Sequence, residues 1–172
     1  MNGASRTAWS RSPPISAPCI KGSCTKGSAP PAFIVHSLAH AVAVLTAAAG
    51  TGRPVLLLSP PDAGIYAGPG WFRAMIEAAH AAVPAAEFTA ILDCGDDAGA
   101  AQAAIRAGIE AVIFTGRPDV ATRLADIAKQ RGMALRTVRP PAAVDLGTMF
   151  FADAETLRRH CCDVLASVTR FC

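Results

Sequence analysis

The strongest constraint on the fold is a short apolar segment that ends abruptly in acidic residues. Residues 87–97 read Glu-Phe-Thr-Ala-Ile-Leu-Asp-Cys-Gly-Asp-Asp, and an alanine-rich segment with helical spacing follows. A short apolar run of this kind is typical of a parallel strand that is covered on both faces. Such a strand delivers the polar residues after it to the carboxyl edge of a sheet, where α/β proteins keep their sites. We therefore expect Asp93 at that edge.

The same strand-and-helix unit repeats along the chain. We predict strands over residues 32–35, 54–59, 88–93, 111–116 and 134–138. Helices are predicted between them, with Ser37 and Asp97 as N-caps and Pro118 in a first turn, and a last helix is predicted over about 153–169. Residues 60–70 are rich in glycine and proline and are predicted to form a loop.

This alternation predicts right-handed βαβ units and a parallel sheet. Five strands cannot close an eight-stranded barrel, which needs about 250 residues. The periodicity therefore leaves two architectures open. One is an open, doubly wound sheet, and the other is a partial barrel completed by another chain.

Composition narrows the function classes. The chain has 172 residues, of which 52% are hydrophobic and 17% charged, and its net charge is +3. It lacks an uninterrupted apolar run of about 18 residues, so a membrane span is not expected. The basic residues are scattered, which argues against nucleic acid as a partner. Six cysteines in a chain large enough for its own core indicate reduced thiols and a cytoplasmic location.

The first 31 residues differ from the rest. They carry Arg6, Arg11, Lys21 and Lys26, contain no acidic residue and are dominated by Ser, Pro and Gly. We expect a disordered tail over residues 1–31, with a transit peptide or a start codon placed too early as alternatives. Residues 32–172 are expected to form a single α/β domain.

Several short motifs, in order, resemble the amino-terminal half of class II ketose-bisphosphate aldolases. They are Tyr66-Ala67-Gly68, Leu92-Asp93-Cys94-Gly95-Asp96, Ala104-Ile105-Arg106-Ala107-Gly108 and Val112-Ile113-Phe114-Thr115-Gly116, and they follow a second strand that ends in Ser59. The resemblance covers roughly residues 32–132. It implies the first half of a (β/α)8 barrel, that is, parallel βα units in a half TIM-barrel-like sheet of about five strands with flanking helices.

The resemblance also implies roles for individual residues. Asp93 matches the acid that exchanges a proton with the substrate oxygen, and Ser59 matches a polar residue near the substrate. Tyr66, Gly68 and Asp96 lie in the matching substrate-side motifs. Cys94 stands where the family has its first zinc-ligand histidine. The acidic ligand expected after the fifth strand is replaced by Arg136-Thr137-Val138-Arg139, and Asp145-Leu146-Gly147 is a displaced echo of it.

The residues offer only an incomplete metal site. Cys94 and His36 are the weak candidates for ligands, and His40 lies at i+4 from His36, so the two imidazoles could share a helix face. Each candidate also has a structural interpretation: Cys94 as a buried thiol, His36 as a capping histidine, and Asp93 as an acceptor for loop amides. Cys94 as a nucleophile, and an acidic Mg²⁺ pocket formed by Asp93 with its neighbours, are further alternatives.

Three functions follow from these observations. The first is a non-catalytic domain of the aldolase type that binds a small phosphorylated sugar, a carbonyl ligand or a partner at its carboxyl edge, with no cofactor. The second is a carbon–carbon lyase whose zinc site is completed by another subunit. The third is a structural half-barrel. Because an open strand edge is a template for association, we expect a homo-oligomer.

Overall fold

The structure is a computed structural model and describes residues 29–142 and 144–168. Six strands are present: β1 (Ala32–Ile34), β2 (Val55–Leu58), β3 (Phe88–Asp93), β4 (Ala111–Ile113), β5 (Ala134–Arg136) and β6 (Val144–Asp145). The helices are α1 (Leu38–Thr51), α2 (Ala63–Tyr66), α3 (Gly68–Ala82), α4 (Ala98–Ala107), α5 (Pro118–Gln130), the 3₁₀ helix η1 (Leu146–Met149) and α6 (Ala154–Val168).

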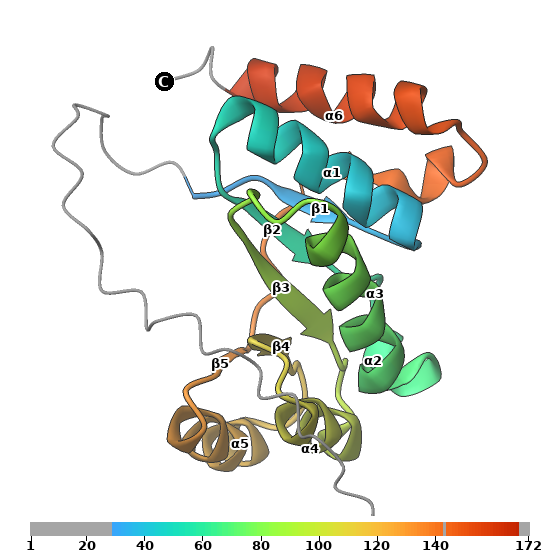
Figure 1. Cartoon of the computed structure of the whole chain (residues 1–172). Coiled ribbons are helices and arrows are strands. Elements are labelled where there is room, and N and C mark those ends of the chain that lie inside the picture. Colours follow the sequence, from blue (N-terminus) through green and yellow to red (C-terminus); the bar gives the residue numbers. More distant parts are fainter. Residues whose placement is uncertain (1–28, 143, 169–172) are drawn as a thin grey trace, which may run out of the picture.

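All strand pairs are parallel, and the order across the sheet is β5-β4-β3-β2-β1-β6. The first five strands therefore lie in chain order, each joined to the next by a helical connection. Figure 1 shows the helices arranged around the strands, from α6 and α1 at the top to α4 and α5 at the bottom. A doubly wound sheet reverses its strand order and carries helices on both faces. Here the first five strands keep their chain order, so the structure has the partial-barrel architecture and not the doubly wound one.

The two faces of the sheet confirm this assignment. One face packs against helices α1, α3, α4, α5 and α6 in a single large buried cluster. The other face carries a second buried cluster that contains strand residues only: Ala32, Ile34, Leu56, Leu58, Ile91, Ala111 and Ile113. Side chains alternate between the two faces along each strand, as the pleat requires. The second face corresponds to the interior of a barrel.

Local signals place the starts of α1 and α4 and the end of α4 where the sequence predicts them, whereas the strands predicted over residues 111–116 and 134–138 end earlier, at Ile113 and Arg136. The Ser37 hydroxyl accepts a hydrogen bond from the His40 amide, and the Asp97 carboxylate accepts one from the Ala100 amide. Each interaction satisfies an amide in the first turn that has no partner within the helix. Gly108 ends α4 with φ 82°, a left-handed conformation that favours glycine.

The structure differs from the predictions in two places. Residues 60–70, predicted as a loop, contain α2 and the start of α3, because amides in this segment hydrogen-bond to carbonyls three and four residues earlier, as Ile65 does to Asp62 and Ala67 to Ala63. The second difference is β6. This two-residue strand has too few residues for a periodic pattern, and only its pairing with β1 defines it.

The segment that follows β6 adds an outer layer to the fold. Helix α6 packs on α1, so α1 is covered by the sheet on one side and by α6 on the other. A helix buried on two sides needs apolar residues around most of its circumference. The composition of α1, LAHAVAVLTAAAGT, meets that need.

Some predictions fall outside the described residues. They include the interpretation of residues 1–28 as a disordered tail, together with Cys19, Cys24 and Cys172. Cys94, Cys161 and Cys162 are described, and all three are free thiols. Within the described residues, no helix combines the length and apolar character needed to cross a bilayer.

Candidate functional site

The polar residues singled out from the sequence gather at the carboxyl edge of the sheet. Ser59 follows β2, Asp93 ends β3, and His36 comes two residues after β1. In a parallel sheet the carboxyl ends of the strands all lie at one edge, which is where α/β proteins bind ligands. The fold therefore brings Ser59, Asp93 and His36 to the same rim, as expected.

Asp93 is held by three donors. Its Oδ1 accepts hydrogen bonds from the amides of Gly95, at 2.9 Å, and Asp62, at 3.3 Å. Its Oδ2 forms an ion pair with the Arg139 guanidinium, and the Asp93 side chain is only 7% exposed. The two hydrogen bonds from backbone amides are the contacts expected if Asp93 is an acceptor for loop amides. The carboxylate thus has its negative charge neutralised at close range.

Ser59 belongs to the same network. Its hydroxyl accepts a hydrogen bond from the Asp93 amide at 2.9 Å and donates one to the Pro60 carbonyl at 2.9 Å. The Ser59 carbonyl accepts a second bond from Arg139 at 2.7 Å. Ser59 is fully buried, so its hydroxyl joins the ends of β2 and β3.

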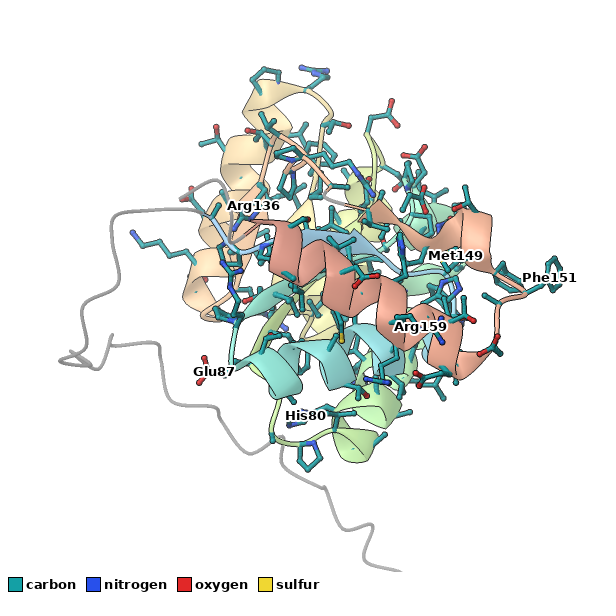
Figure 2. All side chains as sticks on the ribbon, turned by 90° about the horizontal axis from the view of Figure 1, so that it is seen from above. His80, Glu87, Arg136, Met149, Phe151 and Arg159 are labelled. Atoms are coloured by element: carbon teal, nitrogen blue, oxygen red, sulfur yellow. The ribbon has the colours of Figure 1, made fainter. Side chains whose placement is uncertain are left out.

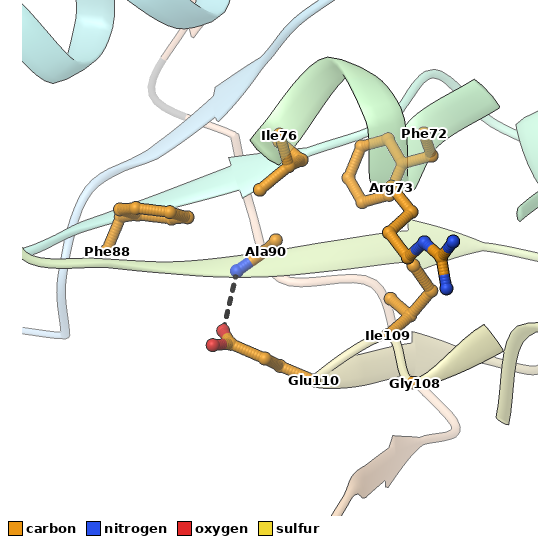
Figure 3. A pocket seen from close by; sticks show the side chains of 8 residues that line it. All are labelled: Phe72, Arg73, Ile76, Phe88, Ala90, Gly108, Ile109 and Glu110. Atoms are coloured by element: carbon orange, nitrogen blue, oxygen red, sulfur yellow. Dashed lines mark hydrogen bonds between the residues drawn. The ribbon is translucent and has the colours of Figure 1, made fainter. Parts of the chain in front are cut away.

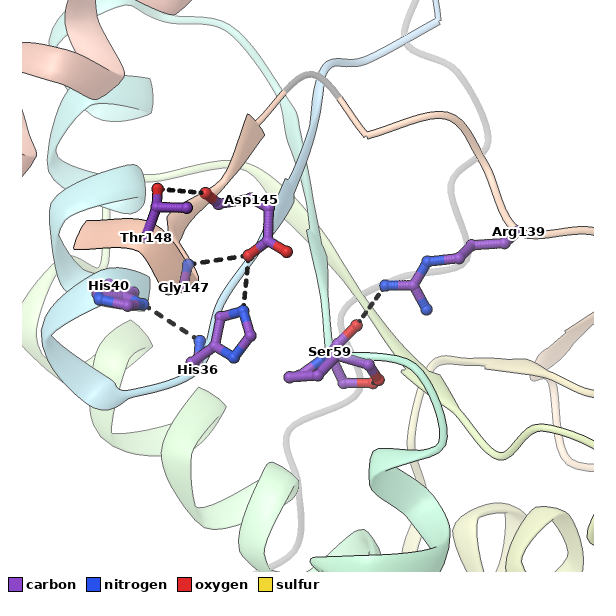
Figure 4. A network of polar contacts seen from close by, with 8 residues as sticks. His36, His40, Ser59, Arg139, Asp145, Gly147 and Thr148 are labelled. Carbon is purple, nitrogen blue, oxygen red and sulfur yellow. Dashed lines mark hydrogen bonds and ion pairs between the residues drawn. The ribbon is translucent and has the colours of Figure 1, made fainter. Parts of the chain in front are cut away.

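Arg139 is the functional-site residue that sequence reasoning missed. It lies in the connector between β5 and β6, and its side chain contacts Asp93 and, as Figure 4 shows, the Ser59 carbonyl. The sequence pattern shows that Arg136-Thr137-Val138-Arg139 replaces an acidic ligand. A cation so close to Asp93 becomes evident only when the path of the connector is known.

Cys94 lies on the opposite side of the sheet from Asp93. Its thiol is completely buried in the cluster between the sheet and the helices. A Cβ atom on Gly64 of α2 would lie 2.5 Å from the Cys94 sulfur, so that glycine is needed for the close packing. Burial, and then the charges of Asp93 and Asp97, raise the pKa of the Cys94 thiol to about 12.

This environment does not fit the zinc ion that the family uses. Zinc would need the Cys94 sulfur open to the rim, but the thiol is completely buried in the cluster that faces the helices. Among the described residues, no group of three or more His, Cys, Asp and Glu side chains is placed to hold a metal. His36 and Cys94 are not brought together. The same raised pKa leaves Cys94 without the thiolate that a nucleophile requires.

The three predicted substrate-side residues take different positions. Tyr66 ends α2 and is 66% exposed. Burial and the Asp62 charge raise the pKa of its hydroxyl, while the Arg139 charge opposes this rise, so Tyr66 lies within electrostatic range of the Asp93–Arg139 pair. Gly68 begins α3 with φ 81°. Asp96 is exposed and makes no hydrogen bond or ion pair with other described residues.

His36 forms a second polar pair on this rim, with a residue of the unpredicted strand β6. The distance from His36 Nε2 to Asp145 Oδ1 is 2.6 Å. The His36 amide donates to Nδ1 of the fully buried His40 at 3.2 Å, and the ring centroids of the two histidines lie 6.1 Å apart. Burial, and then the charge of His36, lower the pKa of His40. The two histidines therefore adjoin each other, although His36 lies before α1 and does not share a helix face with His40.

The acidic residues after β3 do not form a shared pocket. Asp97 uses its carboxylate to cap α4, and Asp96 points into solvent. Only Asp93 is directed toward the rim network. The Mg²⁺ pocket considered from the sequence lacks its second carboxylate here.

A cavity at the other end of the sheet offers little chemistry. It lies between α3, the start of β3 and the α4–β4 connection, and is lined mainly by apolar groups such as Phe72, Ile76 and Phe88 (Figure 3). Its volume is about 20 Å³, room for one water molecule. The Glu110 carboxylate within it accepts a bond from the Ala90 amide. The carboxyl edge therefore remains the candidate site.

The fold and the site together define a (β/α) half-barrel that carries its polar residues on the carboxyl edge. The family profile described as fructose-bisphosphate aldolase class-II matches residues 19–121, more than half of the chain. The chain belongs to the class II fructose-bisphosphate aldolase family. This finding confirms the resemblance seen in the motifs around Tyr66 and Asp93.

A solved structure supports the fold assignment. The crystal structure of a candidate fructose-1,6-biphosphate aldolase from Coccidioides immitis superimposes with a TM-score of 0.52 at 23% sequence identity. The alignment covers 62% of this chain and 40% of that protein. The chain thus spans less than half the length of the protein it resembles. Among curated proteins, no sequence matches this chain.

Proposed function

We propose that this domain binds a small carbonyl compound or phosphorylated sugar at the carboxyl edge of its sheet and does not cleave carbon–carbon bonds. The observation that carries the proposal is the state of Asp93. The carboxylate that resembles the family's proton-transfer acid is neutralised by Arg139 and held by two backbone amides. Both carboxylate oxygens therefore already accept donors of the protein itself, and neither is left free to exchange a proton with a substrate oxygen.

The position equivalent to a metal ligand supports the same proposal. Aldol cleavage of the class II type depends on a Lewis acid that stabilises the enolate, which is a large electrostatic contribution. Cys94, at that position, faces the helix layer and does not face the rim. The described residues therefore keep the scaffold of the family without a fitting first ligand.

Groups suited to a small polar ligand remain on the rim. The Arg139 side chain is 24% exposed and presents a guanidinium, which recognises carboxylate and phosphate oxygens through paired donors. Tyr66 offers an exposed ring and a hydroxyl within electrostatic range of the Asp93–Arg139 pair. Together they would place an anionic group beside Arg139 and a neutral part of the ligand against Tyr66.

Two assays on the full chain test this proposal. Dihydroxyacetone phosphate should show binding by ligand-observed NMR, and Tyr66→Ala should weaken it about tenfold, the equivalent of one lost hydrogen bond. The matched control is His80→Ala, an exposed residue in the last turn of α3, which should leave binding unchanged. Fructose 1,6-bisphosphate should not be cleaved, with or without added Zn²⁺. Zinc-dependent cleavage that Asp93→Asn abolishes without unfolding would show a lyase instead.

A second proposal, assembly into a homo-oligomer, rests on the sheet edges. In the described part of the chain the sheet ends at β5 and β6, each with one side unpaired. Unpaired strand edges are templates for association, and the same edges would be needed for a lyase completed by a second subunit. Light scattering of the purified chain at micromolar concentration should give at least a dimer. A strict monomer would contradict the proposal.

A further inference from the structure

The His36–Asp145 pair is built more precisely than a chance surface contact. Asp145 Oδ1 accepts a hydrogen bond from the Gly147 amide at 2.8 Å as well as contacting His36 Nε2 at 2.6 Å. Burial alone would raise the pKa of the Asp145 carboxyl, but the hydrogen bonds from Gly147 and His36 lower it overall. The carboxylate is therefore ionised at neutral pH and is oriented by its own turn.

The turn also fits closely against the imidazole. A Cβ atom on Gly147 would lie 2.8 Å from His36 Nε2 and 3.0 Å from Cε1. Only a residue without a side chain can occupy this position while the pair is intact. On its other side, the His36 ring makes an edge contact with His40 at an interplanar angle of 79°. Contacts from two elements, η1 and α1, thus fix the direction of the ring.

The direction of the ring decides which nitrogen is available. An ionised carboxylate only accepts hydrogen bonds, so Nε2 must carry the proton that it shares with Asp145. In a neutral imidazole the other nitrogen, Nδ1, then carries the lone pair. Nδ1 has no hydrogen-bond partner among the described residues, and the side chain is 27% exposed. Figure 4 shows this nitrogen pointing away from Asp145.

The surroundings indicate what Nδ1 would meet. The charged and titratable groups around His36 are Asp145 on β6, His40 on α1 and, within electrostatic range of Asp145, Arg139 on the connector. A cationic group would be repelled by Arg139. A neutral hydrogen-bond donor, a hydroxyl group above all, matches this lone pair, and Arg139, which is 24% exposed, could hold an anionic part of the same molecule.

We propose that His36 and Asp145 form a hydroxyl-recognition dyad, in which His36 Nδ1 accepts a hydrogen bond from a hydroxyl group of a ligand bound at the carboxyl edge. This inference rests on the ligand-binding function proposed above. Asp145 acts through His36: it keeps the proton on Nε2 and so keeps the lone pair on Nδ1. Arg139 and the dyad together select a ligand that carries both a hydroxyl and an anionic group.

Nitrogen-15 NMR of the full-length chain tests the dyad without a ligand. Neutral His36 should be the Nε2–H tautomer, and Asp145→Asn should reduce that preference. Predominance of the Nδ1–H tautomer in the wild-type chain would overturn the inference, whatever the chain binds. Circular dichroism and the dispersion of the amide resonances show whether each variant is folded.

A ligand cycle tests recognition of the hydroxyl. The probes are dihydroxyacetone phosphate and hydroxyacetone phosphate, which differ by one hydroxyl group. The wild-type chain should prefer the first by about tenfold, the effect of one hydrogen bond, and His36→Phe should abolish that preference. His160→Phe, on α6, is the matched control and should keep it. Equal binding of both probes to the wild-type chain would overturn the dyad alone, whereas binding of neither would also overturn the ligand-binding function.

Discussion

The two polar pairs on the carboxyl edge, Asp93–Arg139 at the end of β3 and His36–Asp145 at β1 and β6, differ in how their charges are used. Asp93 is 7% exposed and shares its negative charge among Arg139 and two amides. Asp145 is 52% exposed, and its partner His36 keeps one ring nitrogen without a partner in the described part of the chain. Burial makes the Asp93 carboxylate a structural element, whereas the part-exposed Arg139 side chain and the second pair are able to meet a ligand.

This difference follows from what each pair connects. Asp93 ends β3, an inner strand of the sheet, and Arg139 reaches it from the connector between β5 and β6. Asp145 belongs to the edge strand β6, which has a neighbour on one side only. A charge in the middle of a sheet must be neutralised by the protein, because water cannot do it. A charge on an edge strand is partly solvated.

The largest expected effect comes from removing the cation of the buried pair. Arg139→Met should lower the free energy of unfolding by about 3 kcal/mol at neutral pH, because it leaves Asp93 charged and buried without its cation. Arg117→Met removes one member of an exposed pair with Asp119 and should change stability by less than about 0.5 kcal/mol. Urea denaturation measures both variants. Similar losses for the two would show that the buried and exposed pairs do not differ.

A smaller effect is expected from crowding the exposed pair. Gly147→Ala would place a methyl group 2.8 Å from His36 Nε2, and overpacking of this kind costs about 1–3 kcal/mol. The matched control is Gly50→Ala in α1, where the new Cβ meets no atom within 4 Å. That change should stabilise the chain by about 0.5–1 kcal/mol, because glycine is unfavourable inside a helix. Thermal unfolding of both variants should therefore shift in opposite directions.

The smallest effect concerns His40, which lies beneath the exposed pair. Its pKa is lowered from 6.5 in the folded chain, mainly by burial, so the unfolded chain binds its proton more readily. Stability from this residue is present above about pH 6.5 and is lost as the pH falls through the lowered folded pKa. The free energy of unfolding should decrease on acidification from about pH 7 to pH 5. His40→Leu should flatten that slope, and His160→Leu should not.

Asp145 contributes to the stability of the fold in a different pH range from His40. Its lowered pKa stabilises the fold above the ordinary value of 3.8, and this stability disappears only as the pH falls further. Measuring the free energy of unfolding as a function of pH can therefore separate the contribution of His40 from that of Asp145. A slope between pH 7 and pH 5 that is identical in the wild-type chain and in His40→Leu would assign that range to other groups.

A row of aromatic rings leads from the protein surface to His40. Phe151, which is 97% exposed, projects from the segment before α6 (Figure 2). Its ring stacks edge-on against Phe150, and Phe150 in turn contacts His40. The aromatic row thus links the surface to the buried histidine below the dyad.

The sequence by itself determined the features that depend on neighbouring residues. The caps at Ser37 and Asp97, the glycine that ends α4, and the apolar strand before Asp93 are local signals, and each appears in the structure where the pattern predicts it. The family also follows from short motifs, because they lie in the half of the chain that the family profile matches. The carboxyl-edge location of Asp93 follows from the parallel βα rhythm alone.

Only the tertiary structure decided what surrounds those residues. Arg139 lies 46 residues from Asp93, and Asp145 lies 109 residues from His36, so no local pattern connects either pair. The same holds for β6, which exists because it pairs with β1, and for Cys94, whose thiol lies under α2. Charge pairing and burial are set by the path of the chain through space, which is why the chemistry of the rim could not be predicted from spacing.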